Sequence, residues 1–144
     1  HSSCILPSAD TGMFFKKSTF NGDISKWDTS GVTNMQYMFY SATRFNQPIG
    51  SWDVSNVNKI SYMFQEATVF NQPIGNWNIS NLYNMEGLFY GARAFNQPIG
   101  DWDVSNVSNM EGVFMRSIMI CGITKILASV AIQLLIICSS RHTC

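Results

Sequence analysis

The sequence predicts an α/β repeat solenoid of about four turns, and three observations carry this prediction. The hexapeptide FNQPIG occurs at 45–50, 70–75 and 95–100, which gives a period of 25 residues. A tryptophan follows each copy after one variable residue, and no insertion interrupts the register. Since a unit of this length does not bury its own apolar face, such a period predicts units that stack on equivalent neighbours.

A short strand is expected in each unit. In the segment IGSWDVSNV the apolar residues follow the L-x-x-L-x-L-x-x spacing of leucine-rich repeats; they are Ile49, Trp52, Val54 and Val57. This frame predicts a leucine-rich-repeat-like turn whose strand lies near Trp52–Val54.

A short helix is expected after the strand, in VNKISYMFQEA at 57–67. Its apolar residues recur at the spacing of one helical stripe; they are Val57, Ile60, Met63, Phe64 and Ala67. The proline of each FNQPIG segment should end the helix, because proline lacks an N–H group and disfavours helix just ahead of it. The glycines that follow, Gly50, Gly75 and Gly100, would allow a tight bend into the next strand.

Residues that recur once per unit predict the core and a hydrogen-bonded column. The aromatic residues at equivalent positions should pack between turns; they are Phe39, Phe45, Trp52, Phe64, Phe70, Trp77, Phe89, Phe95 and Trp102. The asparagines of FNQPIG, which are Asn46, Asn71 and Asn96, are expected to form a structural column that bonds backbone groups of the tight turns. Ligand binding is the alternative interpretation of that column.

Composition and motifs argue against several function classes. Nine basic and nine acidic residues give no net charge, so no basic face is expected for nucleic acid. The four cysteines lie outside the repeats without metal-ligand spacing, so neither a zinc site nor a disulfide framework is indicated. The only histidines are His1 and His142, and no phosphate loop, nucleophile elbow or HExxH motif occurs. We therefore expect no enzyme, no cofactor and no metal.

One column of side chains leaves a carbohydrate-active enzyme as a remote alternative. It consists of Asp28, Asp53, Asn78 and Asp103, which the repeat should stack about 5 Å apart. That spacing suits a calcium ladder or the paired carboxylates of a carbohydrate-active enzyme. Any repeat with one Asp per turn produces the same spacing, however, so a structural or surface role is the preferred interpretation.

Two long segments carry a family resemblance. FNGDISKWDTSGVTNMQYMF and FNQPIGSWDVSNVNKISYMF closely resemble the phrase F-N-x-x-I-x-x-W-D-x-S-x-V-x-x-M-x-x-M-F of the BspA-like leucine-rich-repeat surface proteins. The resemblance covers about residues 13–114 and implies a solenoid that serves adhesion or interaction, often with a lipid or membrane anchor. Ile60 and Asn78 depart conservatively from the phrase, whereas the pattern stops abruptly after Phe114.

The chain is expected to divide into three parts: an irregular N-terminal fragment at 1–12, the solenoid at 13–114 and an apolar C-terminal segment at 115–144. It begins with His1 and is interpreted as a fragment or a processed product. Residues 118–138 contain a single charged residue, Lys125, and have the length of a membrane-spanning helix. A mistranslated segment and an apolar cap on the last repeat are the alternatives for this tail.

The expected function is that of a non-enzymatic, surface-displayed repeat protein that binds a protein or a glycan in adhesion. An intracellular repeat scaffold with an artefactual or capping tail is the alternative. Exposed positions that vary between turns are the candidate binding surface; they are Ser51, Asn76 and Asp101, then Asn58, Tyr83 and Ser108, then Tyr40, Gln65 and Tyr90. The expected location is the cell surface or a membrane, reached through residues 118–138.

Overall fold

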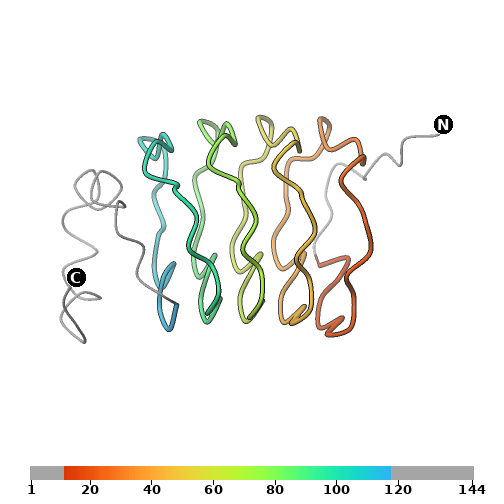
Figure 1. Ribbon diagram of the computed structural model, residues 1–144. Helices are drawn as coiled ribbons and strands as arrows, with labels where there is room; N and C mark the ends of the chain where they lie inside the picture. Colours follow the sequence, from red (N-terminus) through yellow and green to blue (C-terminus); the bar gives the residue numbers. More distant parts are fainter. Residues whose placement is uncertain (1–11, 118–144) are drawn as a thin grey trace.

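The protein forms a solenoid. The computed structural model describes residues 12–117, which wind into successive coils stacked along one axis (Figure 1). Each coil is elongated and has loops at its two ends, which lie at the top and bottom of Figure 1. Equivalent residues of neighbouring coils are separated by 25 positions, so the predicted repeat solenoid is confirmed.

The predicted strand near Trp52–Val54 is wrong. No extended strand occurs anywhere between residues 12 and 117. Isolated parallel bridges instead connect the coils several residues later, and they join Asn34 to Lys59, Lys59 to Asn84, and Asn84 to Asn109. Around Trp52 the chain makes turns, because the N–H of Trp52 donates to the carbonyl of Ile49 at 3.1 Å.

The predicted helix at 57–67 is also wrong, since residues 12–117 contain no helix and this segment is a run of turns. Alternate N–H groups donate to the following coil at 2.7–3.0 Å; the donors are Ile60, Tyr62, Phe64 and Glu66. The N–H groups between them donate three residues back; these donors are Met63, Gln65 and Ala67. Turns that close every three residues therefore produce the apolar spacing that resembles a helical stripe.

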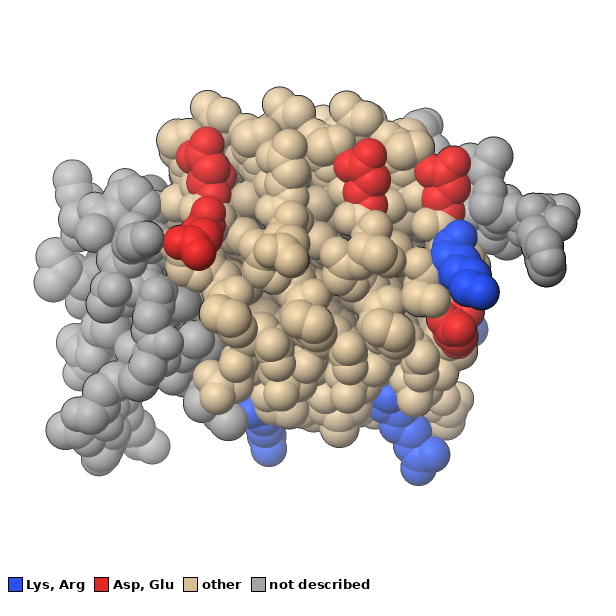
Figure 2. Space-filling model, turned by 45° about the horizontal axis from the view of Figure 1, so that its top comes forward, with Lys and Arg blue, Asp and Glu red and all other residues tan. Residues whose placement is uncertain are grey.

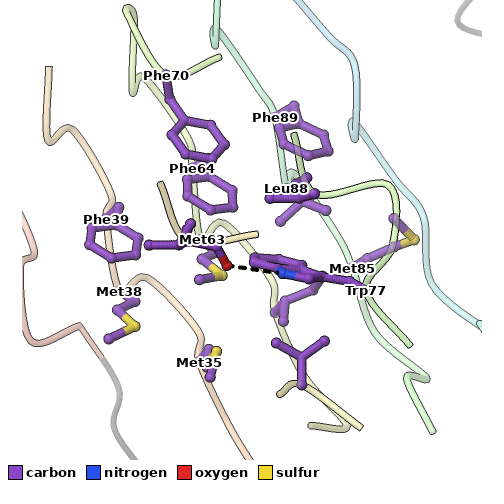
Figure 3. Close-up of a cluster of buried hydrophobic side chains, with 14 of the residues drawn as sticks. Met35, Met38, Phe39, Met63, Phe64, Phe70, Trp77, Met85, Leu88 and Phe89 are labelled. Atoms are coloured by element: carbon purple, nitrogen blue, oxygen red, sulfur yellow. Dashed lines mark hydrogen bonds between the residues drawn. The ribbon is translucent and has the colours of Figure 1, made fainter. Parts of the chain in front are cut away.

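The core is a pair of stacked phenylalanine columns (Figure 3). In the first column, Phe39, Phe64, Phe89 and Phe114 follow one another with ring centroids 5.6–5.9 Å apart. In the second column, Phe45, Phe70 and Phe95 are spaced by 5.9 Å. Within each coil the two columns also touch, since the centroids of Phe64 and Phe70 lie 4.0 Å apart. All of these rings are buried, and such columns supply packing between coils that no single coil could provide.

Each buried tryptophan adds a polar tie between coils. The indole N–H of Trp77 donates to the carbonyl of Ile49 at 3.2 Å, a bond drawn in Figure 3. Trp52 and Trp102 make the equivalent bonds to Ile24 and Ile74 at 3.1 and 3.2 Å. The indole ring can therefore be almost fully buried without leaving its donor unsatisfied.

The glycines of FNQPIG are required by contact with the next coil. A Cβ atom on Gly50 would stand 2.3 Å from the carbonyl oxygen of Pro73, and one on Gly75 would stand 2.4 Å from that of Pro98. Neither glycine has a left-handed backbone. The close approach of backbones, and not a special bend, is therefore what excludes a side chain at these positions.

The predictions for the two ends of the chain remain predictions. Residues 1–11 and 118–144, including the expected apolar helix and membrane span at 118–138, lie outside the described residues. Within residues 12–117 no helix is long and apolar enough to cross a membrane.

Candidate functional site

The aspartate column lies at one end of the coils and forms a series of small side-chain turns. Oδ1 of Asp53 accepts hydrogen bonds from the N–H and the hydroxyl of Ser55 at 3.0 and 2.6 Å. Asp28 and Asn78 make the same pair of bonds with Ser30 and Ser80. The side chain thus closes a turn of its own backbone, which Asp and Asn do equally well.

These bonds keep the aspartates ionised. Hydrogen bonds from the neighbouring serine, first from its hydroxyl and then from its N–H, lower the pKa values of Asp28, Asp53 and Asp103. A glycosidase needs one of its two carboxyl groups protonated as the acid, and none of the three has a raised pKa. No group of three potential metal ligands occurs among residues 12–117. Figure 2, in which this end is turned forward, shows a few acidic side chains on a mostly uncharged surface.

The asparagine column is engaged in the scaffold. The N–H of Asn71 donates to Oδ1 of Asn46 at 2.9 Å, and the N–H of Asn96 donates to Oδ1 of Asn71 at 2.9 Å. The carboxamide of the adjacent glutamine reaches the same oxygen, with Gln72 Nε2 3.0 Å from Asn46 Oδ1. The oxygens of Asn46 and Asn71 therefore accept bonds from the following coil, which leaves little of them for a ligand.

The variable positions expected to bind a partner fall into separate parts of the coil. Ser51, Asn76 and Asp101 are exposed and immediately precede the tryptophans. The next column has its backbone bonded between coils, because Tyr83 N–H donates to Asn58 and Ser108 N–H donates to Tyr83. Of this second column, only Tyr83 presents a large exposed side chain, with Lys59 Nζ 5.5 Å from its ring centroid.

A further surface was not predicted as a unit from the sequence, and we call it the left-handed edge. It lies at the lower end of the coils in Figure 1, from the red turn to the blue turn. Two positions in every coil have φ between 54° and 83° there. The first column consists of Gly12, Tyr37, Tyr62, Gly87 and Gly112, and the second of Lys16, Ser41, Glu66, Gly91 and Arg116.

Six of these ten residues are not glycine, and that has a cost. A left-handed backbone places the Cβ atom of an L-residue too close to the following carbonyl, at about 1 kcal/mol for each residue. Gly87 and Gly91 show that glycine serves at both positions of the same turn. Strain that persists where glycine would relieve it is an indicator of a functional surface.

Aromatic side chains gather on the first coils of this edge. Tyr37 stacks on Tyr62 with centroids 5.2 Å apart and ring planes 14° from parallel. Phe15 stacks on Tyr40 at 4.8 Å and meets Tyr37 edge-on at 6.2 Å. Phe15 and Tyr37 remain 42% and 37% exposed, so the cluster faces solvent and is not an extension of the core.

Carboxylates follow the aromatic residues along the edge. The hydroxyl of Tyr62 donates to Glu86 Oε1, and Asn109 Nδ2 donates to Glu86 Oε2 at 3.0 Å. Burial, followed by the hydrogen bond and charge of Glu86, raises the pKa of Tyr62 well above its usual range, and Glu111 adds to the effect. Tyr62 therefore stays a neutral phenol that holds Glu86 in place.

Two glycines of the next coil, Gly87 and Gly91, leave room for the side chains of Tyr62 and Glu66. A Cβ atom on Gly87 would stand 2.5 Å from Cδ1 of Tyr62, and one on Gly91 would stand 2.6 Å from Oε1 of Glu66. The sequence does contain a signal of this edge: Tyr37 and Tyr62 are replaced by Gly87 at the same position of the repeat. It marks a position where only the backbone matters in one coil and a side chain is kept in another.

Comparison with known protein families places most of the chain in one of them. Residues 10–122 match the model of a family described as "Mycoplasma protein of unknown function, DUF285". No curated protein and no solved structure matches the chain.

Proposed function

Because the chain belongs to the DUF285 family, whose description names no activity, we propose from its surface that it is a non-enzymatic binding module. In this proposal the solenoid is a rigid support and its partner is a protein or a glycan. The module is displayed at a cell surface and acts in adhesion. The residues that hold the partner lie on the left-handed edge.

The observation that carries this proposal is the retention of side chains at strained positions of that edge. Tyr37, Tyr62 and Glu66 all have φ near 57° where glycine would relieve strain, and Tyr37 is exposed. Its stacking on Tyr62 and its edge contact with Phe15 stabilise the ring, but the left-handed backbone gives stability no reason to prefer a tyrosine to a glycine there. Selection for binding supplies one, since exposed tyrosine is enriched at protein interfaces.

Surface display rests on different observations. The repeat phrase resembles that of the BspA-like leucine-rich-repeat surface proteins. We therefore include in the proposal that the chain is related to them. Residues 118–138 have the length and apolar character of a membrane-spanning helix. A membrane-impermeant biotin reagent applied to intact cells tests this part. Labelling of the full chain supports display, whereas labelling only after lysis favours the intracellular scaffold.

The binding function is tested with arrays of glycans and of extracellular-matrix proteins. The labelled full chain is applied beside a Phe64→Asp chain, in which a charge placed in the buried phenylalanine column unfolds the solenoid. We expect saturable binding of the native chain to one protein or glycan and none by the variant. Absence of saturable binding on both arrays, or steady release of sugar from a glycan, contradicts the proposal.

A further inference from the structure

We infer that the left-handed edge binds a protein segment carrying a Lys or Arg side chain, which is held by Tyr37, Tyr62 and Glu66. This inference rests on the proposed binding function and specifies its partner and its contact residues.

The exposed aromatic residues favour a protein over a glycan. A sugar ring stacks on the open face of an aromatic side chain. In this cluster the faces are turned towards one another, because Tyr37 stacks on Tyr62 at 5.2 Å and Phe15 stacks on Tyr40 at 4.8 Å. Ring edges and the hydroxyl group of the exposed Tyr37 are what the cluster offers to solvent, because the hydroxyl of Tyr62 donates to Glu86. Such amphipathic contacts suit the mixed surface of a protein.

The free carboxylate beside this cluster calls for a cation. No residue within 12–117 donates a hydrogen bond to the carboxylate of Glu66, which lies half-buried over Gly91. Glu86, by contrast, already accepts bonds from Tyr62 and Asn109. A guanidinium or ammonium group is the strongest hydrogen-bond donor to such a half-exposed carboxylate.

The charges along the edge place that cation at its centre. In the second left-handed column the order is Lys16, Ser41, Glu66, Gly91 and Arg116. Glu66 therefore has uncharged neighbours on both sides, and the nearest cations of the column are two coils away, about 10 Å along the axis. Lys16 and Arg116 lie over Phe15 and Tyr90 at 5.1 and 5.7 Å. Within this column a basic side chain of a partner meets attraction at Glu66 and repulsion at Lys16 and Arg116. Glu86 and Glu111 of the neighbouring turns add to the attraction around Tyr62.

The test uses a phage library of short random peptides, panned on the immobilised full chain. Peptides selected on the wild type are then measured against three variants. Glu66→Gln removes the charge and keeps the shape of the side chain, and Tyr37→Leu removes a ring. Asp53→Asn is the matched control, because it removes one carboxylate at the other end of the coil, where Asn78 shows that asparagine forms the same turn.

The expected result is a selected motif with one fixed Lys or Arg. Its affinity should fall at least about tenfold on Glu66→Gln, fall on Tyr37→Leu and stay unchanged on Asp53→Asn. Peptides without a fixed basic residue, or equal affinity for Glu66→Gln and wild type, overturn the inference but leave the binding function standing. Array binding to a glycan, with no peptide selected, also overturns it. Absence of saturable binding on both arrays overturns the binding function itself, whatever the panning selects.

Discussion

The ring of Tyr62 lies against Gly87, the equivalent residue of the next coil, and a Cβ atom on Gly87 would stand only 2.5 Å from Tyr62 Cδ1. Both residues have left-handed backbones, with φ of 59° and 57°. Glu66 and Gly91 repeat the relationship, with 2.6 Å between a Cβ atom on Gly91 and Glu66 Oε1. Tyr37 stacks on a ring in the following coil, whereas the side chains of Tyr62 and Glu66 lie over a bare backbone that leaves them room.

This relationship predicts that Gly87→Ala destabilises the solenoid. The new Cβ atom would clash with Tyr62, and the alanine would have to keep a left-handed backbone. The free energy of unfolding should therefore fall by about 2–3 kcal/mol. Urea unfolding followed by tryptophan fluorescence measures the change. Gly31→Ala is the control, since nothing lies within 4 Å of its Cβ position and its φ is not left-handed. Equal effects of the two substitutions would contradict the prediction.

The asparagine column predicts different costs for two substitutions of Asn71. Asn71→Ala leaves the N–H of Asn96 and one donor of Gln97 without the oxygen that they share, which should cost about 1–3 kcal/mol. Asn71→Asp keeps an acceptor oxygen at the same place and should cost less. Thermal and urea unfolding of both variants measure the difference. If aspartate were as damaging as alanine, the column would not act through its oxygen atoms.

Removal of two buried hydroxyl groups should have different effects on the free energy of unfolding. Ser61 Oγ is buried and has no hydrogen-bond partner among residues 12–117, whereas Thr29 Oγ1 donates to the carbonyl of Asp53 at 2.9 Å. Ser61→Ala removes a desolvated polar group and should leave stability unchanged or increase it. Thr29→Val keeps the shape of the side chain but loses the bond, at a cost of about 1 kcal/mol. A loss at Ser61 as large as that at Thr29 would argue against this assignment.

The aspartate turns predict a dependence of stability on acid pH. Bonds from Ser55 lower the pKa of Asp53 below its unfolded value of 3.8. The contribution of these bonds is therefore fully present above pH 3.8 and is lost as the pH falls through the lower pKa of the folded state. Asp53→Asn does not titrate, so its unfolding midpoint in urea should fall less than that of the wild type on acidification. Parallel pH profiles of the two proteins would contradict this prediction.

The repeat register and the core were predictable from the sequence, whereas the local backbone was not. A strict period forces equivalent residues to stack, so the phenylalanines and tryptophans could be assigned to the interior without knowing the path of the chain. The helix prediction for 57–67 failed because turns with bonds from Met63 to Ile60 and from Ala67 to Phe64 space buried residues by three, close to the helical repeat. Bonds from alternate residues to the next coil then replace the bonds of a helix.

The left-handed edge escaped prediction for a related reason. Tyrosine disfavours a left-handed backbone, so Tyr37 and Tyr62 conceal the conformation that Gly87 and Gly112 indicate at the same repeat position. Variation between coils directed attention to exposed columns such as Ser51, Asn76 and Asp101. Only the structure brings Tyr37, Tyr62 and Glu66 together on one edge, because they come from turns that the sequence pattern assigns to a helix.

The claim that side chains of the left-handed edge are kept for binding at the expense of stability is tested most directly with Glu66→Gly. The free energy of unfolding and the affinity for a peptide selected on the wild type are measured on the same variant, beside Ser41→Gly at the same repeat position. Both variants should gain up to about 1 kcal/mol, as relief of the left-handed strain exceeds the added entropy of the unfolded chain. Only Glu66→Gly should lose binding. Unchanged binding by Glu66→Gly, or a loss of stability in both variants, would contradict the account.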